Sequence, residues 1–276
     1  MIQQNLRLPL MALASFALLS ACGNNASDNT AKSVADKAVK EVSSAAKKVA
    51  PKKAKWSYSG ETGPEHWGEL SEAFATCSTG KLQSPFDISA DITAVLPELG
   101  LNYNSVPMKV LNNGYTIQAD TAGGGQLVVD GKTYDLLQFH FHAGSEYTID
   151  GATYPMDLHL VHASKEGELA VVGVVIKEGE ANPELAKLWA NMPASKGENV
   201  VEGQSVDVNN LLPASKQYYR FMGSLTTPPC SEGVNWHVLS EPITASAEQI
   251  AAYRAIHPMN ARPLQPENNR LVVLGK

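Results

Sequence analysis

The chain has 276 residues, 43% of them apolar, a formal net charge of −6 and no internal repeat. This composition excludes a disordered or fibrous protein and leaves room for one large domain with accessory segments. Residues 56–276 carry 13 basic and 25 acidic side chains, a net charge of −12, which argues against nucleic acid as a partner.

The chain begins with the pattern of an export signal. Arg7 precedes an apolar run from Leu8 to Leu19, which is too short for a membrane span and is typical of a secretory signal peptide. The quartet Leu19-Ser20-Ala21-Cys22 resembles a bacterial lipobox, where the signal peptide is cut before the cysteine and lipid is attached to it. We therefore expect residues 1–21 to be a signal peptide and Cys22 to carry lipid, with a plain signal peptide cut nearby as the alternative. A lipoprotein of this kind is exported and lies on the periplasmic side of the outer membrane or at the cell surface.

Residues 22–55 are rich in lysine and alanine. Between Asn24 and Lys55, eight lysines stand against three acidic residues, a net charge of +5, and a short stretch of heptad spacing ends at Pro51. The repeat is brief and its side chains are small, so the segment is predicted to be a tether and not a stable coiled coil. Its lysines can contact anionic lipid headgroups or cell-wall phosphates, and a merely solvated linker fits the sequence equally well.

The three cysteines are consistent with export. If Cys22 carries lipid, Cys77 and Cys230 remain as an even pair in an oxidising compartment. A disulfide between them closes a loop of about 150 residues, for which loop entropy gives a stabilisation of at most about 4 to 5 kcal/mol. Two unpaired buried thiols are the alternative.

The stretch QFHFH, residues 138–142, is predicted to be a strand with two different faces. Alternate residues of a strand share a face, so Gln138, His140 and His142 point one way while Phe139 and Phe141 point the other. One face is polar and the other belongs to the core. Two histidines at i and i+2, with aromatic residues behind them, favour a metal site or a catalytic pair.

A hairpin turn is predicted at Asp150-Gly151, which lies between two short β-type segments. With this turn at the centre, His142 lies opposite His159 and His140 lies on the diagonal, so three imidazoles can converge on one ion. A bulge near Gly144 would shift this register. Three neutral imidazoles with a fourth position open are typical of a catalytic zinc, and the lack of a thiolate disfavours copper(I) and iron–sulfur clusters.

The other histidines are interpreted as structural. His162 falls on the opposite face of the segment DLHLVH and is predicted to be a hydrogen-bonded core residue. His66, His237 and His257 have no comparable neighbours in the sequence.

Taken together, these motifs resemble those of the α-class carbonic anhydrases. The resemblance rests on QFHFH, SEY, DLHLVH and GSLTTPPCSEGVNW, together with WSYSG, GPEHW, QSPFDI, LNNGY, LAVVGV and NARPLQPENNR in the family's order. It covers nearly all of residues 56–276 and identifies the chain as a bacterial, exported member of the family. It implies a single catalytic domain over 56–276 that is predominantly β with short helices, built on a large, twisted, mainly antiparallel sheet with Zn²⁺ at the bottom of a conical cleft.

The activity implied by the resemblance is that of a zinc lyase, carbonate dehydratase, which interconverts carbon dioxide and bicarbonate. Zinc held by His140, His142 and His159 would lower the pKa of bound water to about 7, the value established for carbonic anhydrase itself, and zinc-bound hydroxide would attack CO₂ to give bicarbonate and a proton. By the same resemblance, Thr226 would accept the hydroxide's hydrogen bond and pass its own proton toward Glu146, which orients the attack.

Supporting roles also follow from the resemblance. Thr227 would line the cleft and hydrogen-bond bicarbonate, while Gln138 would accept a hydrogen bond from His140 and Asp157 one from His159. Family members commonly carry glutamate at the position of Asp157, and the shorter side chain predicts slightly altered zinc retention. The CO₂ pocket would be apolar because the substrate has no dipole. It would consist of Val161, Val171, Leu225, Val234 and Trp236.

Tyr115, in LNNGY, stands where fast members of the family carry the histidine that shuttles protons. A phenol with a pKa of about 10 is a poor relay at neutral pH, whereas an imidazole near 6.5 is well matched. We therefore expect a turnover that is limited by proton export and depends on buffer concentration. Secreted members also join cysteines placed like Cys77 and Cys230, and this bridge would brace the catalytic loop.

Two other functions are weighed against the enzyme. A non-catalytic binding module on the same fold is disfavoured by the intact histidine trio with Glu146 and Thr226. A structural lipoprotein follows from the tether alone and needs no zinc. The sequence leaves open the oligomeric state, a dimer included, the actual proton shuttle and turnover rate, the direction of flux, the partner of the tether and the membrane face that carries the anchor.

Overall fold

The structure is a computed structural model that describes residues 54–121 and 123–276. The predicted signal peptide, Cys22 and the tether up to Lys53 lie outside the described residues. Within the described part of the chain, no helix has both the length and the apolar character needed to cross a membrane. Residues 54–276 form one compact unit.

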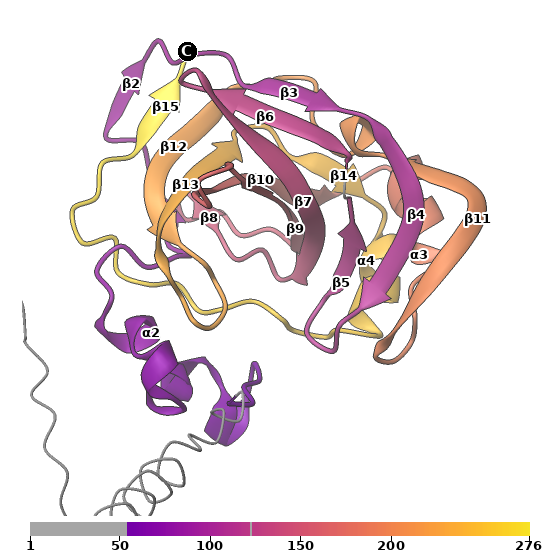
Figure 1. Ribbon diagram of the computed structural model, residues 1–276, viewed down its shortest axis with the longest axis horizontal. Helices are drawn as coiled ribbons and strands as arrows, with labels where there is room; N and C mark the ends of the chain where they lie inside the picture. The colour runs from indigo at the N-terminus through magenta and orange to yellow at the C-terminus, as the bar shows by residue number, and fades with distance from the viewer. Residues whose placement is uncertain (1–53, 122) are drawn as a thin grey trace, which may run out of the picture. The chain divides into compact units, whose positions relative to one another are not determined.

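One large sheet dominates this unit (Figure 1). Within the described ranges it has 13 strands, in the order β11-β4-β5-β7-β9-β10-β13-β12-β15-β2, with β14 beside β10, and β6 between β3 and β7. Most neighbours are antiparallel; β10 is parallel to β13 and β14, and β15 is parallel to β2. A second, two-stranded sheet pairs β1 with β8. The predicted fold class, mainly antiparallel β with short helices, is confirmed.

The strands are β1 (Asp87–Ile88), β2 (Ile92–Ala94), β3 (Gly100–Tyr103), β4 (Ser105–Asn112), β5 (Ile117–Asp120), β6 (Gly125–Val129), β7 (Lys132–Ala143), β8 (Thr148–Ile149), β9 (Met156–Ala163), β10 (Leu169–Glu178), β11 (Gly197–Asp207), β12 (Tyr218–Ser224), β13 (Glu232–Leu239), β14 (Ile243–Ala245) and β15 (Val273–Gly275).

The helices are short, and two of them begin at side-chain caps. They are α2 (Thr76–Thr79), α3 (Pro183–Trp189) and α4 (Ala247–Arg254), with 3₁₀ turns η1 (Gly60–Thr62), η2 (Pro64–Glu69), η3 (Glu72–Phe74) and η4 (Val208–Leu211). The Asn182 side chain accepts from two backbone N–H groups at the start of α3, and Ser246 with Gln249 forms a capping box on α4. In Figure 1, α2 lies with the N-terminal turns at one side of the sheet.

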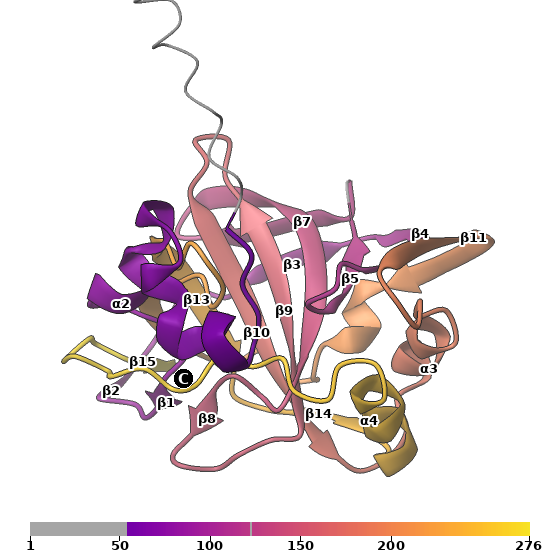
Figure 2. The ribbon, with the colours of Figure 1, turned by 90° about the horizontal axis from the view of Figure 1, so that it is seen from below.

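The two faces of the central strands enter different cores. Phe139 and Phe141 of β7 pack into the larger apolar cluster with Leu158 and Leu160 of β9, as the alternation of β7 predicted. Trp236 of β13 belongs to a second cluster on the opposite face. Figure 2 shows β7, β9 and β10 side by side in the middle of the unit. The histidines of β7 therefore lie on a face separated from the larger core.

The predicted register of the histidine hairpin is wrong by two residues. The turn itself is present, with positive φ at Asp150 and Gly151, and Ile149 bridges Ala152. However, His140 and not His142 is the residue opposite His159. Residues beyond Ala143 leave the β7–β9 ladder, and β8 pairs with β1 instead.

The register changes by two residues in the segment around Gly144, between the bridge of Ile149 with Ala152 and the ladder that ends at Ala143, so an irregularity is present where a bulge was expected. Within the ladder, a further change of one residue lies between Leu136 and Gln138. A shift of two residues keeps every side chain on its original face, because the period of a strand is two. The wrong register therefore did not change the predicted convergence of the three histidines.

Candidate metal centre

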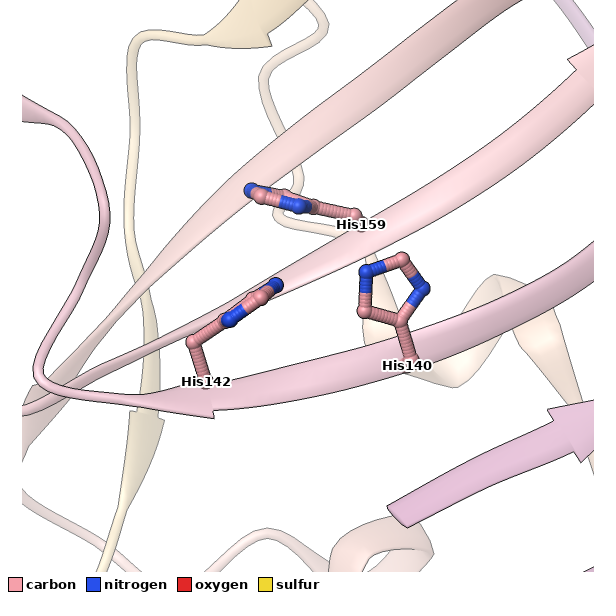
Figure 3. Close-up of side chains that lie close together, drawn as sticks. All are labelled: His140, His142 and His159. Atoms are coloured by element: carbon pink, nitrogen blue, oxygen red, sulfur yellow. The ribbon is translucent and has the colours of Figure 1, made fainter. Parts of the chain in front are cut away.

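His140 and His142 of β7 and His159 of β9 converge on one point (Figure 3). One ring nitrogen from each lies within 4.8 Å of one from each of the others. His142 and His159 are buried and His140 is half-buried. Across the described ranges, 54–121 and 123–276, this is the one group of three or more potential ligands that could hold a metal ion.

Two of the rings are oriented by acceptors behind them. His140 Nδ1 lies 2.9 Å from Gln138 Oε1, and His142 Nδ1 lies 2.6 Å from the carbonyl oxygen of Asn260. Each Nδ1 therefore carries the proton and donates, which leaves the Nε2 lone pair free to bind a metal. The buried Nε2 of His142 has no hydrogen-bond partner within the described residues.

The trio fits a metal ion electrostatically as well. Burial lowers the pKa of His140 well below its usual value, with further lowering by His142 and His159, and burial also lowers the pKa of His142. Neutral imidazoles are the form that binds zinc. Three imidazole nitrogens, with no thiolate in the group, are the donor set of a catalytic zinc site.

His159 is held less tightly than the other two. Its Nε2 lies 3.4 Å from Asp157 Oδ2, which is not a hydrogen bond of normal geometry, and its Nδ1 lies 3.8 Å from Glu146 Oε2. Asp157 Oδ2 instead accepts from the Glu146 N–H at 2.7 Å and from Ser145 Oγ at 3.2 Å. Burial raises the pKa of Asp157, but His159, His142 and the Glu146 N–H together bring it below its usual value.

Glu146 is a buried carboxyl beside the trio. Its Oε1 accepts from the backbone N–H of Arg262 at 2.9 Å, and its Oε2 lies 3.6 Å from His142 Nε2. Burial raises the pKa of Glu146 to about 7, against a lowering effect of His159 and of the Thr226 hydroxyl. Thr226 is itself buried and follows β12. The predicted pair Glu146 and Thr226 is thus placed next to the histidines, although no hydrogen bond of standard geometry joins the two side chains.

A cavity of about 140 Å³ opens onto two of the three histidines, His140 and His142. Its lining includes four predicted site residues, Gln138, His140, His142 and Thr227, and Tyr115 as a fifth. Trp56 and Tyr58 also line it, and sequence reasoning gave them no role although it noted the motif WSYSG. The Trp56 and Tyr115 rings are stacked, 4.0 Å apart and inclined by 12°.

The five residues predicted for the CO₂ pocket lie in one apolar cluster. Val171, Val234 and Trp236 are buried, and Val161 and Leu225 are partly buried against them. The Trp236 ring lies 4.9 Å from that of His159. The cluster therefore adjoins the trio, although none of its members lines the 140 Å³ cavity.

The other histidines are apart from the trio. His162 is fully buried, with Nε2 2.9 Å from the Tyr103 hydroxyl and Nδ1 3.3 Å from the Ala170 carbonyl, so the predicted core role is confirmed. His66 is exposed on η2, and His257 bonds to Asn112. His237 is fully buried, and neither of its ring nitrogens has a hydrogen-bond partner of standard geometry within the described residues.

Cys77 of α2 and Cys230 form the predicted disulfide, with Cα atoms 5.0 Å apart. The alternative of two free thiols is thereby excluded. The backbone N–H of Cys230 donates to the Thr227 carbonyl at 2.8 Å. The bridge therefore meets the segment that carries Thr226 and Thr227.

A larger cavity of about 560 Å³ lies nearby and shares Tyr58 with the smaller one. Glu146 and Arg262 also line it, along with the exposed Met259. None of the three histidines does, so the larger cavity is not the metal site.

Comparison with known proteins gives a consistent result. Residues 62–275 match a family model described as eukaryotic-type carbonic anhydrase. A carbonic anhydrase of Pectobacterium carotovorum is 44% identical over 219 residues, which are 79% of this chain and 90% of that protein. An α-carbonic anhydrase from Thermovibrio ammonificans, solved with the inhibitor sulfanilamide, superposes with a TM-score of 0.78 at 48% identity and covers 80% of this chain and 100% of that one. Dioscorin, solved with ascorbate, superposes with a TM-score of 0.74 at 33% identity over 80% of this chain and 98% of its own.

Proposed function

The chain belongs to the family of eukaryotic-type, or α-class, carbonic anhydrases, and on that premise we propose that it hydrates carbon dioxide reversibly to bicarbonate and a proton. Zinc is the cofactor of this family, and His140, His142 and His159 would hold it. The observation that carries the proposal is the convergence of these three imidazoles within 4.8 Å, with the Glu146 carboxyl beside them.

A bound zinc ion supplies the Lewis acidity that makes water a nucleophile near neutral pH. The protein's own residues then orient the reactants. Gln138 and the Asn260 carbonyl keep the protons of His140 and His142 on Nδ1, so their Nε2 lone pairs face the centre of the site.

Thr226 and Glu146 would direct the attack. Glu146 already accepts from the Arg262 N–H through Oε1, which leaves Oε2 to accept a hydrogen bond from the Thr226 hydroxyl. A threonine that donates to Glu146 has its oxygen lone pairs free to accept from the attacking water. This fixes one orientation of the attacking water, and such positioning lowers the barrier of the hydration step.

The remaining groups would hold the substrate. The cluster of Val171, Val234 and Trp236 beside His159 offers CO₂ an apolar surface, with Val161 and Leu225 at its edge. The Thr226 N–H would meet a substrate oxygen, and the Thr227 hydroxyl in the cavity would hydrogen-bond bicarbonate.

The test is stopped-flow CO₂ hydration with zinc quantified in the same sample. We expect about one zinc per chain and catalysis in the native protein, and loss of both in His159→Gln. The matched control is His162→Gln, on the same strand but on the opposite face, which should keep zinc and activity. Folded native protein without zinc or activity would contradict the enzyme and favour a binding module on this fold, a class suggested by the similarity to dioscorin.

We also propose that the protein is exported and anchored by lipid on Cys22, on the periplasmic side of the outer membrane or at the cell surface. The proposal is supported by the lipobox-like Leu19-Ser20-Ala21-Cys22. In a bacterial host, labelled palmitate should enter the native protein and not Cys22→Ser, which should move to the soluble fraction. Equal membrane association of the two proteins would contradict the anchor.

A further inference from the structure

Arg262 is a buried cation that joins distant parts of the chain. Its side chain is 3% exposed and lies over the Trp67 ring, 5.6 Å from the ring centre. Nη2 donates to the Cys77 carbonyl at 2.8 Å, and Nη1 donates to the Ser84 carbonyl at 2.7 Å and to Gln83 Oε1 at 2.9 Å. Burial lowers the pKa of Arg262 to about 10, so it remains charged at neutral pH.

The backbone of the same residue holds Glu146. The Arg262 N–H donates to Glu146 Oε1 at 2.9 Å, in a buried hydrogen bond. Any displacement of Arg262 therefore moves the donor that orients this carboxylate. Arg262 itself does not line the cavity of the metal site.

Gln83 and Ser84 connect this arginine to the segment that carries Thr226. We call residues 225–231, between β12 and β13, the threonine loop. Gln83 Nε2 donates to the Cys230 carbonyl at 3.1 Å, near one end of the loop. At the other end, the Ser84 N–H donates to Ser224 Oγ at 2.9 Å and the Ser224 N–H donates to Ser84 Oγ at 3.2 Å.

We propose that Gln83 and Arg262 are positioning residues that set the placement of Glu146 relative to Thr226. The Arg262 N–H holds Glu146, and the Arg262 side chain is held by Gln83 and Ser84. Gln83 and Ser84 in turn bond to Cys230 and Ser224, at the two ends of the threonine loop. The inference rests on the proposed function, because it assigns these residues to the same reaction.

This arrangement differs from ordinary packing in a way that kinetics can detect. Gln83 is 3% exposed and lines neither the metal-site cavity nor the apolar cluster beside His159. A substitution there should leave zinc binding and the Michaelis constant unchanged. It should lower kcat, since an attacking group misplaced by a fraction of an ångström loses rate.

The experiment compares Gln83→Met with Gln249→Met in the zinc-loaded protein, in concentrated buffer so that proton export does not limit kcat. Methionine has nearly the shape of glutamine but makes none of the three hydrogen bonds of the Gln83 amide, the third of which Nε2 donates to Glu232 Oε1 at 3.0 Å. Gln249 is also buried and bonds the backbone of Asn182 at 2.9 and 2.7 Å, at the start of α3. We expect kcat to fall roughly tenfold in Gln83→Met, with KM and zinc content within about twofold of the native values, and no such fall in Gln249→Met.

A double-mutant cycle isolates the mechanism. In a Thr226→Val background the hydroxyl that Gln83 is inferred to position is absent, so Gln83→Met should lower kcat by less than about twofold. An equal fall in both backgrounds, or unchanged kcat with a loss of stability like that of Gln249→Met, would overturn the proposal. If Gln83→Met does not fold, Arg262→Lys replaces it, because lysine keeps the charge and the backbone N–H but cannot reproduce the fork of donors.

The failure of the proposed function is distinguishable from the failure of this inference. A native protein that binds zinc but does not hydrate CO₂ overturns both. An active native protein with an unaffected Gln83→Met variant overturns only the positioning role.

Discussion

At the scale of single residues, Asp157 is the side chain whose length matters most for the metal. Its Oδ2 lies 3.4 Å from His159 Nε2 and instead accepts hydrogen bonds from the Glu146 N–H and the Ser145 hydroxyl. An outer acceptor in direct contact with a histidine ligand raises metal affinity by about tenfold or more.

We therefore predict that Asp157→Glu, which is one methylene longer, slows zinc release by a few-fold to roughly tenfold. The measurement is the rate of zinc transfer to a chelator. Asp135→Glu is the control, since Asp135 is an exposed carboxylate on the neighbouring strand β7. Equal release rates for the native protein and Asp157→Glu would contradict the prediction.

Tyr115 lines the cavity of the metal site and stacks on Trp56. A phenol exchanges protons poorly at neutral pH, whereas an imidazole with a pKa near 6.5 does so readily. Tyr115→His should raise turnover several-fold in weak buffer and change it little in concentrated buffer.

Stopped-flow rates across a buffer series test this expectation about Tyr115. Tyr115→Phe is the control and should behave like the native protein. If the native rate is already independent of buffer, another group exports the proton.

At the scale of structural elements, the disulfide fastens α2 to the threonine loop across 153 residues of chain. Closing so long a loop restricts the unfolded state, and removing such a bridge costs about 2 to 5 kcal/mol. We predict a loss of this size in the double variant Cys77→Ser, Cys230→Ser, measured by urea unfolding with zinc bound.

Reduction of the native protein provides an independent comparison for the disulfide. Its unfolding midpoint should move to that of the double variant, and the double variant should not respond to reductant. If the double variant had the same unfolding free energy as the oxidised native protein, a stabilising role of the disulfide would be excluded.

The strand β8 explains why the turn was predicted and the register was not. Asp150-Gly151 has the residues of a tight turn, and the positive φ values are there. Asp87 accepts hydrogen bonds from the Thr148 hydroxyl and from the Gly151 N–H, so the turn is fastened to β1 and not to the β7–β9 ladder. A pairing with a strand more than 60 residues away has no local signal.

At the scale of the whole molecule, two buried histidines outside the metal site make the unfolding free energy fall in acid. Burial lowers the pKa of His162 to about 4 and that of His237 to about 3, from the usual 6.5. Below pH 6.5 the unfolded chain binds protons that the folded chain does not, so the unfolding free energy falls as pH falls. The slope is at most about 1.4 kcal/mol per pH unit for each histidine, between about pH 6.5 and the folded pKa.

The test is urea unfolding between pH 7 and pH 5 for the native protein and His237→Leu. The variant should lose stability less steeply, since it lacks one of the two groups, and leucine leaves no ring nitrogen without a partner. His66→Leu, at an exposed site, should keep the native slope. The zinc ligands are the same in all three proteins, so they contribute equally to the pH dependence of each unfolding free energy. Parallel curves for His237→Leu and the native protein would contradict the assignment.

The sequence by itself determined the features that depend on local periodicity and on residue type. Alternation along β7 placed His140 and His142 on one face and Phe139 and Phe141 on the other, and the motifs identified the family. The third ligand, His159, also followed, because a two-residue error in register leaves a side chain on the same face.

The groups that surround the three histidines come from distant parts of the chain and are known only from the tertiary structure. The Asn260 carbonyl behind His142, the Trp56 ring on Tyr115, and the link from Glu146 through Arg262 to Gln83 all join residues that are far apart in the chain. Such pairings are set by how whole elements pack and where each buried polar group finds its partner, so no local pattern specifies them. Sequence periodicity is a local property, so it shows which residues share a face of a strand or helix. The groups that pack against that face depend on the complete fold.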